Sequence, residues 1–448
     1  MKILIIPFNI ESHIYSTFSF TETLKGNGYD IYYAVHSSFV ELIEKQGYKA
    51  YAINKFLFGY GLETSLRKGM PNSYVSSLID RLTNKFYTER KIGLLEIVNF
   101  VKPDLIITDI FCSTDFIILY SYLKLNNTKF CFFQGSYCNI DSYNSPSVDS
   151  PLYPNQKTKL LIEYFFKKAF FSLENLIESI LYFGRSSNWL IRKNFKKNKI
   201  NSQYNYTKNR ISQIHFKNLT YFIFLNKELE MNKKLPANYR YLPTKTLEKR
   251  AIVIDNDYDE QSFKILKKKN EGYKIIYLSL GTYIVKEDEK IILQLINKII
   301  ETLNIKSNYI LISALGSFHN KALKHERHFS FIKVPQLEIL KFSDVFITHG
   351  GTGSITEAIE YQVPMLVYNF NLVYDHIGNA KKVGFYEIGI EGSPKEDTHN
   401  LIVSKIELLL NDCKYANNLI TLNTKIDKNH NLFKSNVLEQ IELLEIII

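Results

Sequence analysis

The chain has 448 residues, of which 45% are hydrophobic and 14% aromatic, and its formal net charge is +11. This length suffices for two domains with separate cores, and this composition excludes an intrinsically disordered protein. The four cysteines form no CxxC pair, which argues against a zinc site and a disulfide framework and favours a reducing compartment. No run of 18 apolar residues exists, so we expect no membrane-spanning helix.

The positive charge gathers between about residues 155 and 235, in tracts such as KNFKKNKINSQYNYTKNR (Lys193–Arg210). Such a charge fits an anionic ligand, an acidic membrane surface or nucleic acid, and the alternative is a solvated lysine-rich segment. Neither zinc-finger spacing nor a basic region followed by heptads accompanies it. We therefore expect no nucleic-acid partner.

The first part of the chain alternates short apolar runs with helix-like segments. The runs are KILIIP, IYYAV, DLIIT and KFCFF, at Lys2–Pro7, Ile31–Val35, Asp104–Thr108 and Lys129–Phe133. Their continuous hydrophobicity is typical of strands buried on both faces of a parallel sheet. The first run lacks a cleavage site of small residues, so it predicts a strand and not a signal peptide. We therefore expect a cytoplasmic protein, and a peripheral contact with the inner face of the membrane stays open.

The alternating pattern of apolar runs and helix-like segments stops between about residues 151 and 250. Amphipathic helical stretches (LLIEYFFKKAFFSLENLIESILYFG) come first, and the polar basic tract follows them. The segment LPANYRYLPTKTLEKR is predicted to be a linker. We therefore place an N-terminal domain at residues 1–245.

A second series of apolar runs predicts a second domain at residues 246–425. Its members are KIIYLSL, YILISAL, FSFIKV, DVFIT and PMLVY, at Lys274–Leu280, Tyr309–Leu315, Phe329–Val334, Asp344–Thr348 and Pro364–Tyr368. Two such βα series predict two doubly wound α/β domains. Residues 426–448 are predicted to form a helix that packs back on the N-terminal domain.

The run DVFIT ends in HGGTGS, at the edge of the predicted sheet where ligands bind. A helix is predicted directly afterwards, with Ser354 as its N-cap and Glu357 at the spacing of a capping box. The N-terminus of a helix attracts phosphate, and glycines let a diphosphate approach without meeting a Cβ. Three glycines stand here: Gly350, Gly351 and Gly353. The alternative is that they serve only the turn.

The pattern continues well beyond this junction. In order along Lys333–Gly384 stand Pro335-Gln336, His349-Gly350-Gly351, Gly353-Ser354, Glu357, Val363-Pro364, Asp375 and Asn379-Ala380. Two further motifs are YLSLGT (Tyr277–Thr282) and KPDLIITDIF (Lys102–Phe111). Together these segments resemble family 1, the UDP-glycosyltransferase superfamily, and in particular the bacterial branch that includes macrolide glycosyltransferases.

The resemblance implies a GT-B enzyme, in which two Rossmann-like domains face a cleft and the C-terminal one holds a UDP-sugar as co-substrate. It implies no further cofactor and no metal. In the family pattern, Val334 and Gln336 lie near the nucleotide base, Glu357 binds the ribose, and Asp375 and His376 face the sugar. The residues implied to hold the diphosphate are Gly281, Thr282, His349, Gly351, Thr352, Gly353 and Ser354.

The sequence departs from the family pattern at several positions. Lys333 stands where many members have a tryptophan stacked on the base, and His376 stands where glutamine is usual. Gln362 replaces a common glycine, and Asn369 a common proline. These departures leave the transferred sugar open, and a dTDP-sugar is the alternative donor.

Sugar transfer to a hydroxyl needs a base, and His13 follows the first strand at the expected place. Histidine titrates near neutral pH and suits this role, although a lone histidine is usually an ordinary exposed residue. The family's base occupies this place in the chain, which favours catalysis. Asp109 is predicted to hold the imidazole by accepting its other N–H, with Asp104 and Asp115 as rivals.

We therefore expect an inverting hexosyltransferase that acts on a hydroxyl of a small hydrophobic acceptor. Three alternatives remain. A glycolipid-forming transferase would use the aromatic and basic stretch Phe165–Lys217 at a membrane surface. A sugar-nucleotide epimerase would need no acceptor, and a non-catalytic protein would bind the nucleotide sugar without turnover.

Overall fold

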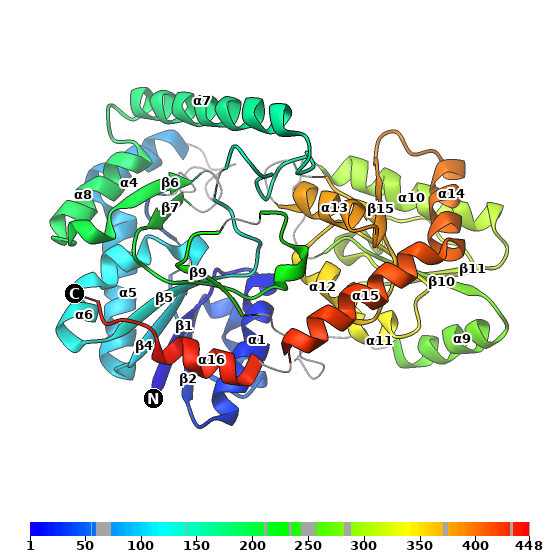
Figure 1. Cartoon of the computed structure of the whole chain (residues 1–448), viewed down its shortest axis with the longest axis horizontal. Coiled ribbons are helices and arrows are strands. Elements are labelled where there is room, and N and C mark those ends of the chain that lie inside the picture. The colour runs from blue at the N-terminus through cyan, green and yellow to red at the C-terminus, as the bar shows by residue number, and fades with distance from the viewer. Residues whose placement is uncertain are drawn as a thin grey trace.

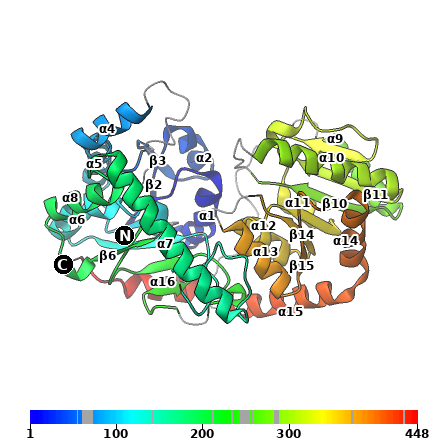
Figure 2. The same ribbon diagram turned by 90° about the horizontal axis from the view of Figure 1, so that it is seen from above.

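The protein is described by a computed structural model that covers residues 1–54, 56–59, 73–140, 142–209, 213–232, 235–242, 255, 258–281, 288–370, 375–430 and 433–447 (Figure 1). Two α/β units lie side by side, each built on one parallel sheet (Figure 2). No helix in these ranges is long and apolar enough to cross a membrane.

The N-terminal unit contains a seven-stranded parallel sheet with the order β3-β2-β1-β4-β5-β8-β9. Its strands are β1 (Lys2–Ile6), β2 (Asp30–Val35), β3 (Lys49–Ala52), β4 (Leu105–Asp109), β5 (Lys129–Gln134), β8 (Tyr221–Ile223) and β9 (Tyr239–Tyr241). In β1, Ile3 and Ile5 enter one apolar core, whereas Leu4 and Ile6 enter the core on the other face. Burial on both faces explains why the strand reads as a continuous apolar run.

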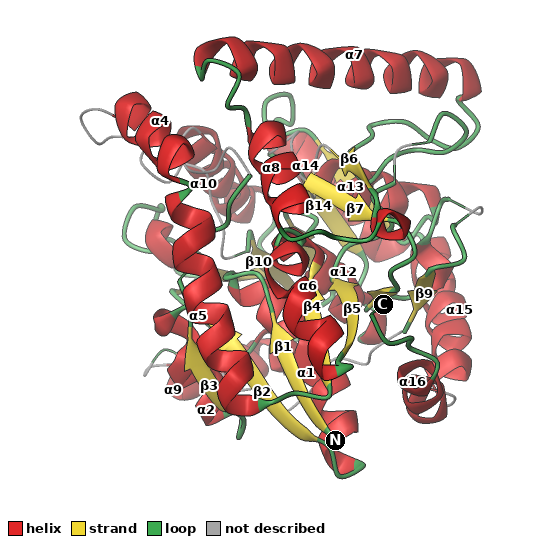
Figure 3. Cartoon of the chain, turned by 90° about the vertical axis from the view of Figure 1, so that its left-hand side faces the viewer, coloured by secondary structure: helices red, strands yellow, loops and turns green. Residues whose placement is uncertain are grey.

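Helices surround this sheet. They are α1 (Glu11–Gly26), α2 (Val40–Lys45), α4 (Ser73–Thr83), α5 (Lys85–Val101), α6 (Asp115–Asn126), α7 (Lys157–Leu181) and α8 (Ser187–Lys197). A separate antiparallel hairpin is formed by β6 (Tyr206–Asn209) and β7 (Gln213–Phe216). Helix α7 forms an outermost layer above the rest of this unit (Figure 3).

The C-terminal unit contains a six-stranded parallel sheet with the order β12-β11-β10-β13-β14-β15. Its strands are β10 (Lys274–Ser279), β11 (Tyr309–Ala314), β12 (His328–Phe331), β13 (Val345–Thr348), β14 (Met365–Tyr368) and β15 (Gly389–Gly392). Its helices are α9 (Tyr258–Asn270), α10 (Glu289–Ile305), α11 (Gln336–Leu340), α12 (Thr352–Glu360), α13 (His376–Phe385), α14 (His399–Asn411) and α15 (Cys413–His430). This strand order is that of the dinucleotide-binding Rossmann fold.

The predicted α/β class with two doubly wound domains is therefore confirmed, and each of the nine predicted apolar runs overlaps a strand. The middle of the chain is more ordered than predicted, because β6, β7, β8 and β9 all lie between residues 151 and 250. The predicted linker includes β9, which forms the edge of the first sheet. The predicted boundary at residue 245 lies outside the described residues.

The end of the chain returns to the N-terminal unit through α16 (Phe433–Glu442) (Figure 1). Lys129 Nζ donates to the carbonyls of Ile441 and Glu442, at 3.3 and 3.0 Å. Arg240 on β9 donates to the side chain of Gln440 at 2.9 Å. The predicted start of this C-terminal segment at residue 426 falls inside α15.

The two units touch beyond the carboxyl ends of their sheets. The Thr352 hydroxyl at the start of α12 donates to the carbonyl of Gly135, directly after β5, at 2.9 Å. A Cβ at Gly378 in α13 would lie 2.0 Å from the carbonyl oxygen of Val148. The backbones of the two units therefore approach each other closely at α13.

Candidate active site

The order of strands in the first sheet reverses between β1 and β4, which are paired neighbours. In open α/β sheets, ligands bind beyond the carboxyl ends of the strands at such a point. His13 lies in the first turn of α1, shortly after β1, and Asp109 is the last residue of β4. The fold therefore brings the two predicted catalytic residues to the place where a ligand is expected.

His13 and Asp109 contact each other directly. His13 Nδ1 lies 2.7 Å from Asp109 Oδ2, and the carboxylate also accepts from the backbone N–H groups of Phe111 at 2.9 Å and Phe8 at 3.3 Å. The aspartate side chain is fully buried, whereas 21% of the histidine side chain is exposed. The carboxylate therefore orients the imidazole so that its Nε2 is the nitrogen left for a substrate.

The surroundings of His13 change its affinity for protons. Phe8 and Phe111 place their rings edge-on to the imidazole, at centroid distances of 5.5 and 5.2 Å. Burial alone would lower the pKa of His13, but the charge and hydrogen bond of Asp109, together with the charge of Asp375, raise that pKa above 6.5. The imidazolium form is therefore stabilised, which suits a group that accepts a proton.

The rival carboxylates have other partners. Asp104 accepts from the backbone N–H of Lys2 at 2.7 Å, where β1 begins. Asp115 is buried and forms a bidentate pair with Arg90, at 3.0 and 2.5 Å. Of the three predicted candidates, Asp109 is the one bonded to His13.

The second sheet reverses its strand order between β10 and β13. Gly281 follows β10 shortly after its end, and His349 follows β13 directly. A Cβ at Gly281 would lie 2.5 Å from the His349 ring, and a Cβ at Gly351 would lie 2.8 Å from the same ring. The His349 ring therefore lies against the backbone at both positions, and a side chain at either one would clash with it.

The N-cap of helix α12 lies three residues earlier than predicted. Its N-cap is Gly351, which provides no side-chain cap, and Ser354 lies inside the first turn. The predicted capping box of Ser354 and Glu357 is therefore wrong. A Cβ at Gly353 would meet no atom within 4 Å, so the fold does not require this glycine. The N–H groups of the first turn are left for an anion to bind.

His349 and His376 lie next to each other in this site. Their rings are edge-to-face, with centroids 4.6 Å apart. Burial and the neighbouring His376 hold the pKa of His349 well below its ordinary value, and burial also lowers the pKa of His376. His349 Nδ1 is buried and finds no hydrogen-bond partner among the described residues. The neutral imidazole of His349 is thus a hydrogen-bond donor and not a cation.

Three residues predicted around the nucleotide form one cluster. The Gln336 amide donates to Glu357 at 2.5 Å and lies 3.4 Å from the Ser354 hydroxyl. Tyr277 on β10 donates to the Gln336 carbonyl oxygen at 3.1 Å. The predicted base-binding residue Val334 packs against the core beside them. The side chains predicted to hold base and ribose are thus brought together.

Asp375 connects the two halves of the site. It precedes α13 and accepts from the Asn379 amide at 3.1 Å, and that amide also donates to the carbonyl of Gly350 at 2.9 Å. Because the charge of Asp375 acts on His13, the predicted sugar-facing residue and the predicted base lie near each other. Thr282, predicted to contact the diphosphate, lies outside the described residues.

Two lysines lie between the units: Lys382, which was not predicted to belong to the site, and Lys333, which was noted only as a departure from the family pattern. Lys382 on α13 is 4% exposed, with Nζ 4.6 Å from the centroid of the Tyr137 ring. Burial lowers the pKa of Lys382, against the raising effects of Glu230 and Asp375. Lys333 forms an ion pair with Glu11 of α1 at 3.1 Å. The sequence contains no pattern that predicts the burial of a helical lysine such as Lys382 between two domains.

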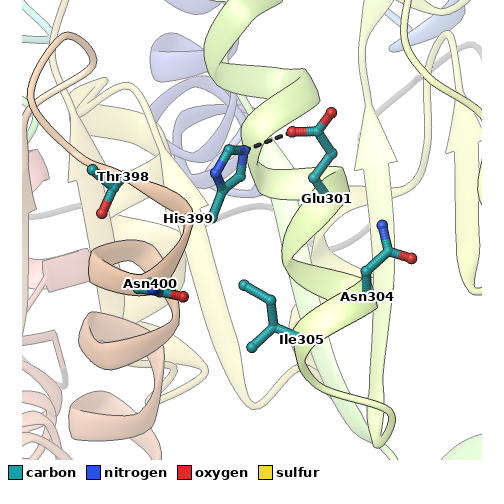
Figure 4. Close-up of a pocket in the computed structure, with 6 residues that line it drawn as sticks. All are labelled: Glu301, Asn304, Ile305, Thr398, His399 and Asn400. Carbon is teal, nitrogen blue, oxygen red and sulfur yellow. Dashed lines mark hydrogen bonds and ion pairs between the residues drawn. The ribbon is translucent and has the colours of Figure 1, made fainter.

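A hollow of about 390 Å³ lies elsewhere, on the C-terminal unit between α10 and α14 (Figure 4). His399 pairs with Glu301 across it at 2.6 Å, and the Thr398 hydroxyl caps α14. Among the described residues, no three His, Cys, Asp or Glu side chains are placed to hold a metal ion.

Comparison with known proteins gives one family. Residues 260–432 match the family described as UDP-glucoronosyl and UDP-glucosyl transferase. The uncharacterized UDP-glucosyltransferase YdhE of Bacillus subtilis (strain 168) is 23% identical over 371 residues, which cover 82% of this chain and 79% of that protein. The matched segment includes the glycine junction and all of α12 and α13.

Solved structures share the whole fold. The glycotransferase of kitacinnamycin superposes with a TM-score of 0.66 at 14% identity, over 99% of this chain and 98% of that one. CalG4, the calicheamicin glycosyltransferase, gives 0.65 at 14% identity, over 98% and 97%. VinC in complex with dTDP gives 0.61 at 13% identity, over 98% and 100%. The fold is therefore GT-B.

The donor-binding signature, the matched family and the fold agree with one another. The sequence resemblance to family 1 is confirmed. The chain therefore has the GT-B fold, and residues 260–432, which make up most of its C-terminal unit, match the UDP-glucoronosyl and UDP-glucosyl transferase family.

Proposed function

We propose that the protein transfers a hexose from a UDP-sugar to a hydroxyl group of a small hydrophobic acceptor, with inversion at the anomeric carbon. The observation that carries this proposal is that the His13–Asp109 pair and the uncapped N-terminus of α12 both lie beyond the carboxyl ends of their sheets, where Thr352 of one unit contacts Gly135 of the other. The base comes from one sheet and the diphosphate site from the other. An acceptor and a donor held between the units would meet there.

In the proposed step, Asp109 accepts the Nδ1–H of His13 and leaves Nε2 free. The acceptor oxygen attacks the anomeric carbon while its proton passes to Nε2, and the bond between the anomeric carbon and the diphosphate oxygen breaks. The products are the glycoside, the nucleoside diphosphate and protonated His13. Because attack and departure occur on opposite faces of the sugar, the anomeric configuration inverts.

The leaving diphosphate gains negative charge and needs stabilisation. In this proposal it comes from the N–H groups of the first turn of α12, from the helix dipole and from the neutral His349. The room around Gly353 supports this arrangement, because a side chain would fit there without any clash. Packing alone does not require a glycine at this position, which supports the proposal that a diphosphate approaches the backbone here.

The donor is proposed to be a UDP-sugar, with dTDP as the alternative nucleotide. The name of the Bacillus subtilis relative includes UDP-glucosyltransferase, whereas VinC was solved with dTDP. Asp375 and His376 are proposed to bind sugar hydroxyls, and Gln336 and Glu357 to bind the nucleoside. The acceptor is proposed to be a polyketide-like or aromatic molecule, since CalG4 and the kitacinnamycin enzyme are named for natural products.

A second candidate function is glycolipid formation at the inner face of the membrane. The observation that favours it is the exposed apolar surface of α7, which could place a lipid acceptor near the enzyme. In either case the chain is proposed to act in the cytoplasm with the same donor site, and hydrogen bonds from amide N–H groups are proposed to stabilise the diphosphate without a metal.

A thermal-shift titration with UDP, dTDP and GDP tests the donor site. Ligand at a hundred times its dissociation constant adds about 2.7 kcal/mol to stability. We expect a shift with UDP that Glu357→Ala and His349→Ala abolish. No shift with any of the three nucleotides would support the non-catalytic alternative.

Transfer itself is tested by His13→Ala with a panel of natural-product acceptors and UDP-hexoses. We expect the wild type to form product and the variant to form it roughly two to four orders of magnitude more slowly. The affinity of the variant for UDP should be unchanged. Unchanged transfer in this variant would overturn the assignment of the base. Isomerisation of the donor sugar without an acceptor would support an epimerase instead.

A further inference from the structure

Helix α7 has its polar and apolar faces in an unusual arrangement. It runs for 25 residues along the outside of the N-terminal unit, above the other elements (Figures 1 and 3). In a surface helix of a globular protein, the apolar stripe normally faces the core. In α7, Leu160 is the one buried residue within Lys157–Leu181.

The face of α7 that meets the protein is polar. Lys167 pairs with Asp149 at 2.8 Å and with Glu163 at 2.9 Å, and Ser150 donates to Glu163 at 2.6 Å. Further along, Glu178 accepts from Arg81 at 2.9 Å. The side chains of Glu163, Lys167 and Glu178 are only 17–22% exposed. Hydrogen bonds and ion pairs therefore attach the helix by its polar face.

The opposite face of α7 is apolar and faces outward. Six large side chains recur at spacings of three, four and seven residues and are between 48% and 71% exposed: Ile162, Phe166, Phe170, Leu173, Ile177 and Ile180. The same helical spacing puts Lys168 and Glu174 at the two edges of this face. An apolar surface of this extent on a soluble protein marks an interaction site.

Residues of α4 extend this surface, and the segment of the chain that contains it is basic. Tyr74 of α4 stacks on Tyr182 at the end of α7, with centroids 5.5 Å apart, and Val75 and Ile79 beside it are about half exposed. Residues 157–199, which include α7 and α8, contain ten lysines and arginines but three acidic residues. Two of those acids, Glu163 and Glu178, are paired on the inner face.

We propose that α7 is a membrane-docking helix that lies in the plane of an anionic lipid bilayer, with its outward face among the acyl chains. The apolar side chains supply burial, and the lysines and arginines around them supply attraction to acidic headgroups. A second copy of the chain would instead bring two basic surfaces together, and like charges repel. The charge therefore favours the anionic bilayer as the occupant.

This position has a consequence for the site. The Lys167 ammonium also donates to the Ser147 hydroxyl at 2.9 Å, so α7 is bonded to the segment whose Val148 carbonyl meets α13. Docking would thus hold the domain boundary close to the lipid surface. The proposal concerns where the enzyme binds, and it does not depend on the donor or the acceptor.

Flotation of the full chain with vesicles tests the proposal. We expect binding to phosphatidylcholine vesicles that contain phosphatidylglycerol, and much weaker binding to phosphatidylcholine alone. High salt should weaken the binding, because the screening length falls from about 10 Å at 0.1 M to about 3 Å at 1 M. The triple variant Ile162→Ser, Phe166→Ser, Ile180→Ser should lower the vesicle-bound to free ratio roughly a hundredfold.

A matched control removes exposed apolar side chains from the C-terminal unit. Phe263, Leu401 and Leu408 are 76%, 42% and 47% exposed, and the triple serine variant at these positions should bind vesicles as the wild type does. Both triple variants should keep the melting temperature and the nucleotide-induced shift of the wild type. This readout separates a failure of docking from a failure of folding or of the proposed function.

Three results would overturn the proposal. The first is a wild type that floats with neither kind of vesicle or equally with both. The second is a triple α7 variant that binds as the wild type does. The third is a wild type that forms a dimer in sedimentation, becomes monomeric in the α7 variant and ignores lipid, because a second copy would then be the occupant.

Discussion

The contact between Asp109 and His13 gives the sharpest test of the proposed chemistry, through the substitution Asp109→Asn. The amide is nearly the same size as the carboxylate and keeps one oxygen, which can still accept from the Phe111 N–H. The NH₂ group then faces His13 Nδ1 and donates to it. The imidazole proton must move to Nε2, so the nitrogen that should accept the acceptor's proton is blocked.

The size of the effect follows from the geometry. A hydrogen bond of 2.7 Å to an ionised group is worth about 1.5–3 kcal/mol, and 1.36 kcal/mol corresponds to tenfold in rate. Loss of this stabilisation of the imidazolium alone slows transfer about 10- to 150-fold. The wrong tautomer adds to this loss, so we expect a total decrease of roughly 10² to 10⁴-fold.

The dependence of kcat/KM on pH separates these effects from simple damage. In the wild type the base works when unprotonated, and Asp109 raises the pKa of His13 above 6.5, so activity should rise with pH through that raised value. Without the carboxylate the pKa of His13 falls, because burial then dominates. The acid limb of the remaining activity should therefore move to lower pH.

A matched control is Asp115→Asn, which removes another fully buried carboxylate and leaves Arg90 without its ion pair. We expect this variant to melt at a lower temperature but to keep the acid limb of the wild type. The reasoning would be refuted if Asp109→Asn lost activity while the acid limb of its pH profile stayed at the pH of the wild type. An equal shift of the acid limb in Asp115→Asn would also refute it. UDP affinity should stay unchanged for Asp109→Asn, because the proposed donor site lies in the other unit.

The remaining predictions concern the donor site and the domain boundary. The Cβ of Gly353→Ala would meet no atom within 4 Å, so the variant should melt near the temperature of the wild type. Calorimetry should show weaker UDP binding, and unchanged affinity would mean that the diphosphate does not bind at this turn. At Gly281, φ is +79° and a Cβ would lie 2.5 Å from the His349 ring. Gly281→Ala should therefore lower the stability of the ligand-free protein by about 1–3 kcal/mol. A melting temperature equal to that of the wild type would contradict this packing. Glu357→Gln should weaken UDP binding about tenfold without moving the acid limb, and equal affinity would exclude a ribose contact. Gly378→Ala would place a Cβ 2.0 Å from a carbonyl oxygen of the other unit, so small-angle scattering should give a larger radius of gyration; an unchanged radius would mean that the domains adjust locally.

Much of the fold could be predicted because its strands are buried on both faces. Runs such as Lys2–Ile6 and Tyr309–Ala314 contain little except apolar residues, and this pattern is hard to mistake. The strands β8 and β9 have three residues each and follow a lysine-rich tract, so the local sequence carries too little signal. They become strands through long-range pairing, because β8 pairs with β5 and β9 then pairs with β8.

The site shows the same division between local and long-range information. The helix after His349 was predicted from its residues, but its start was misplaced because Ser354 and Glu357 imitate a cap. Glu357 instead accepts from Gln336, 21 residues away along the chain. The pairing of His13 with Asp109 was inferred from the family and from strand ends. The burial of Lys382 depends on the other domain, which no local pattern reveals.

The chain passes from one unit to the other twice, once between β9 and α9 and again between α15 and α16. A single connection would allow the units to swivel in any direction. Rotation about the line that joins the two crossings leaves the span of both connections unchanged. Opening and closing of the enzyme should therefore follow one angular coordinate, so that each closure returns His13 to the same position relative to the donor-binding residues.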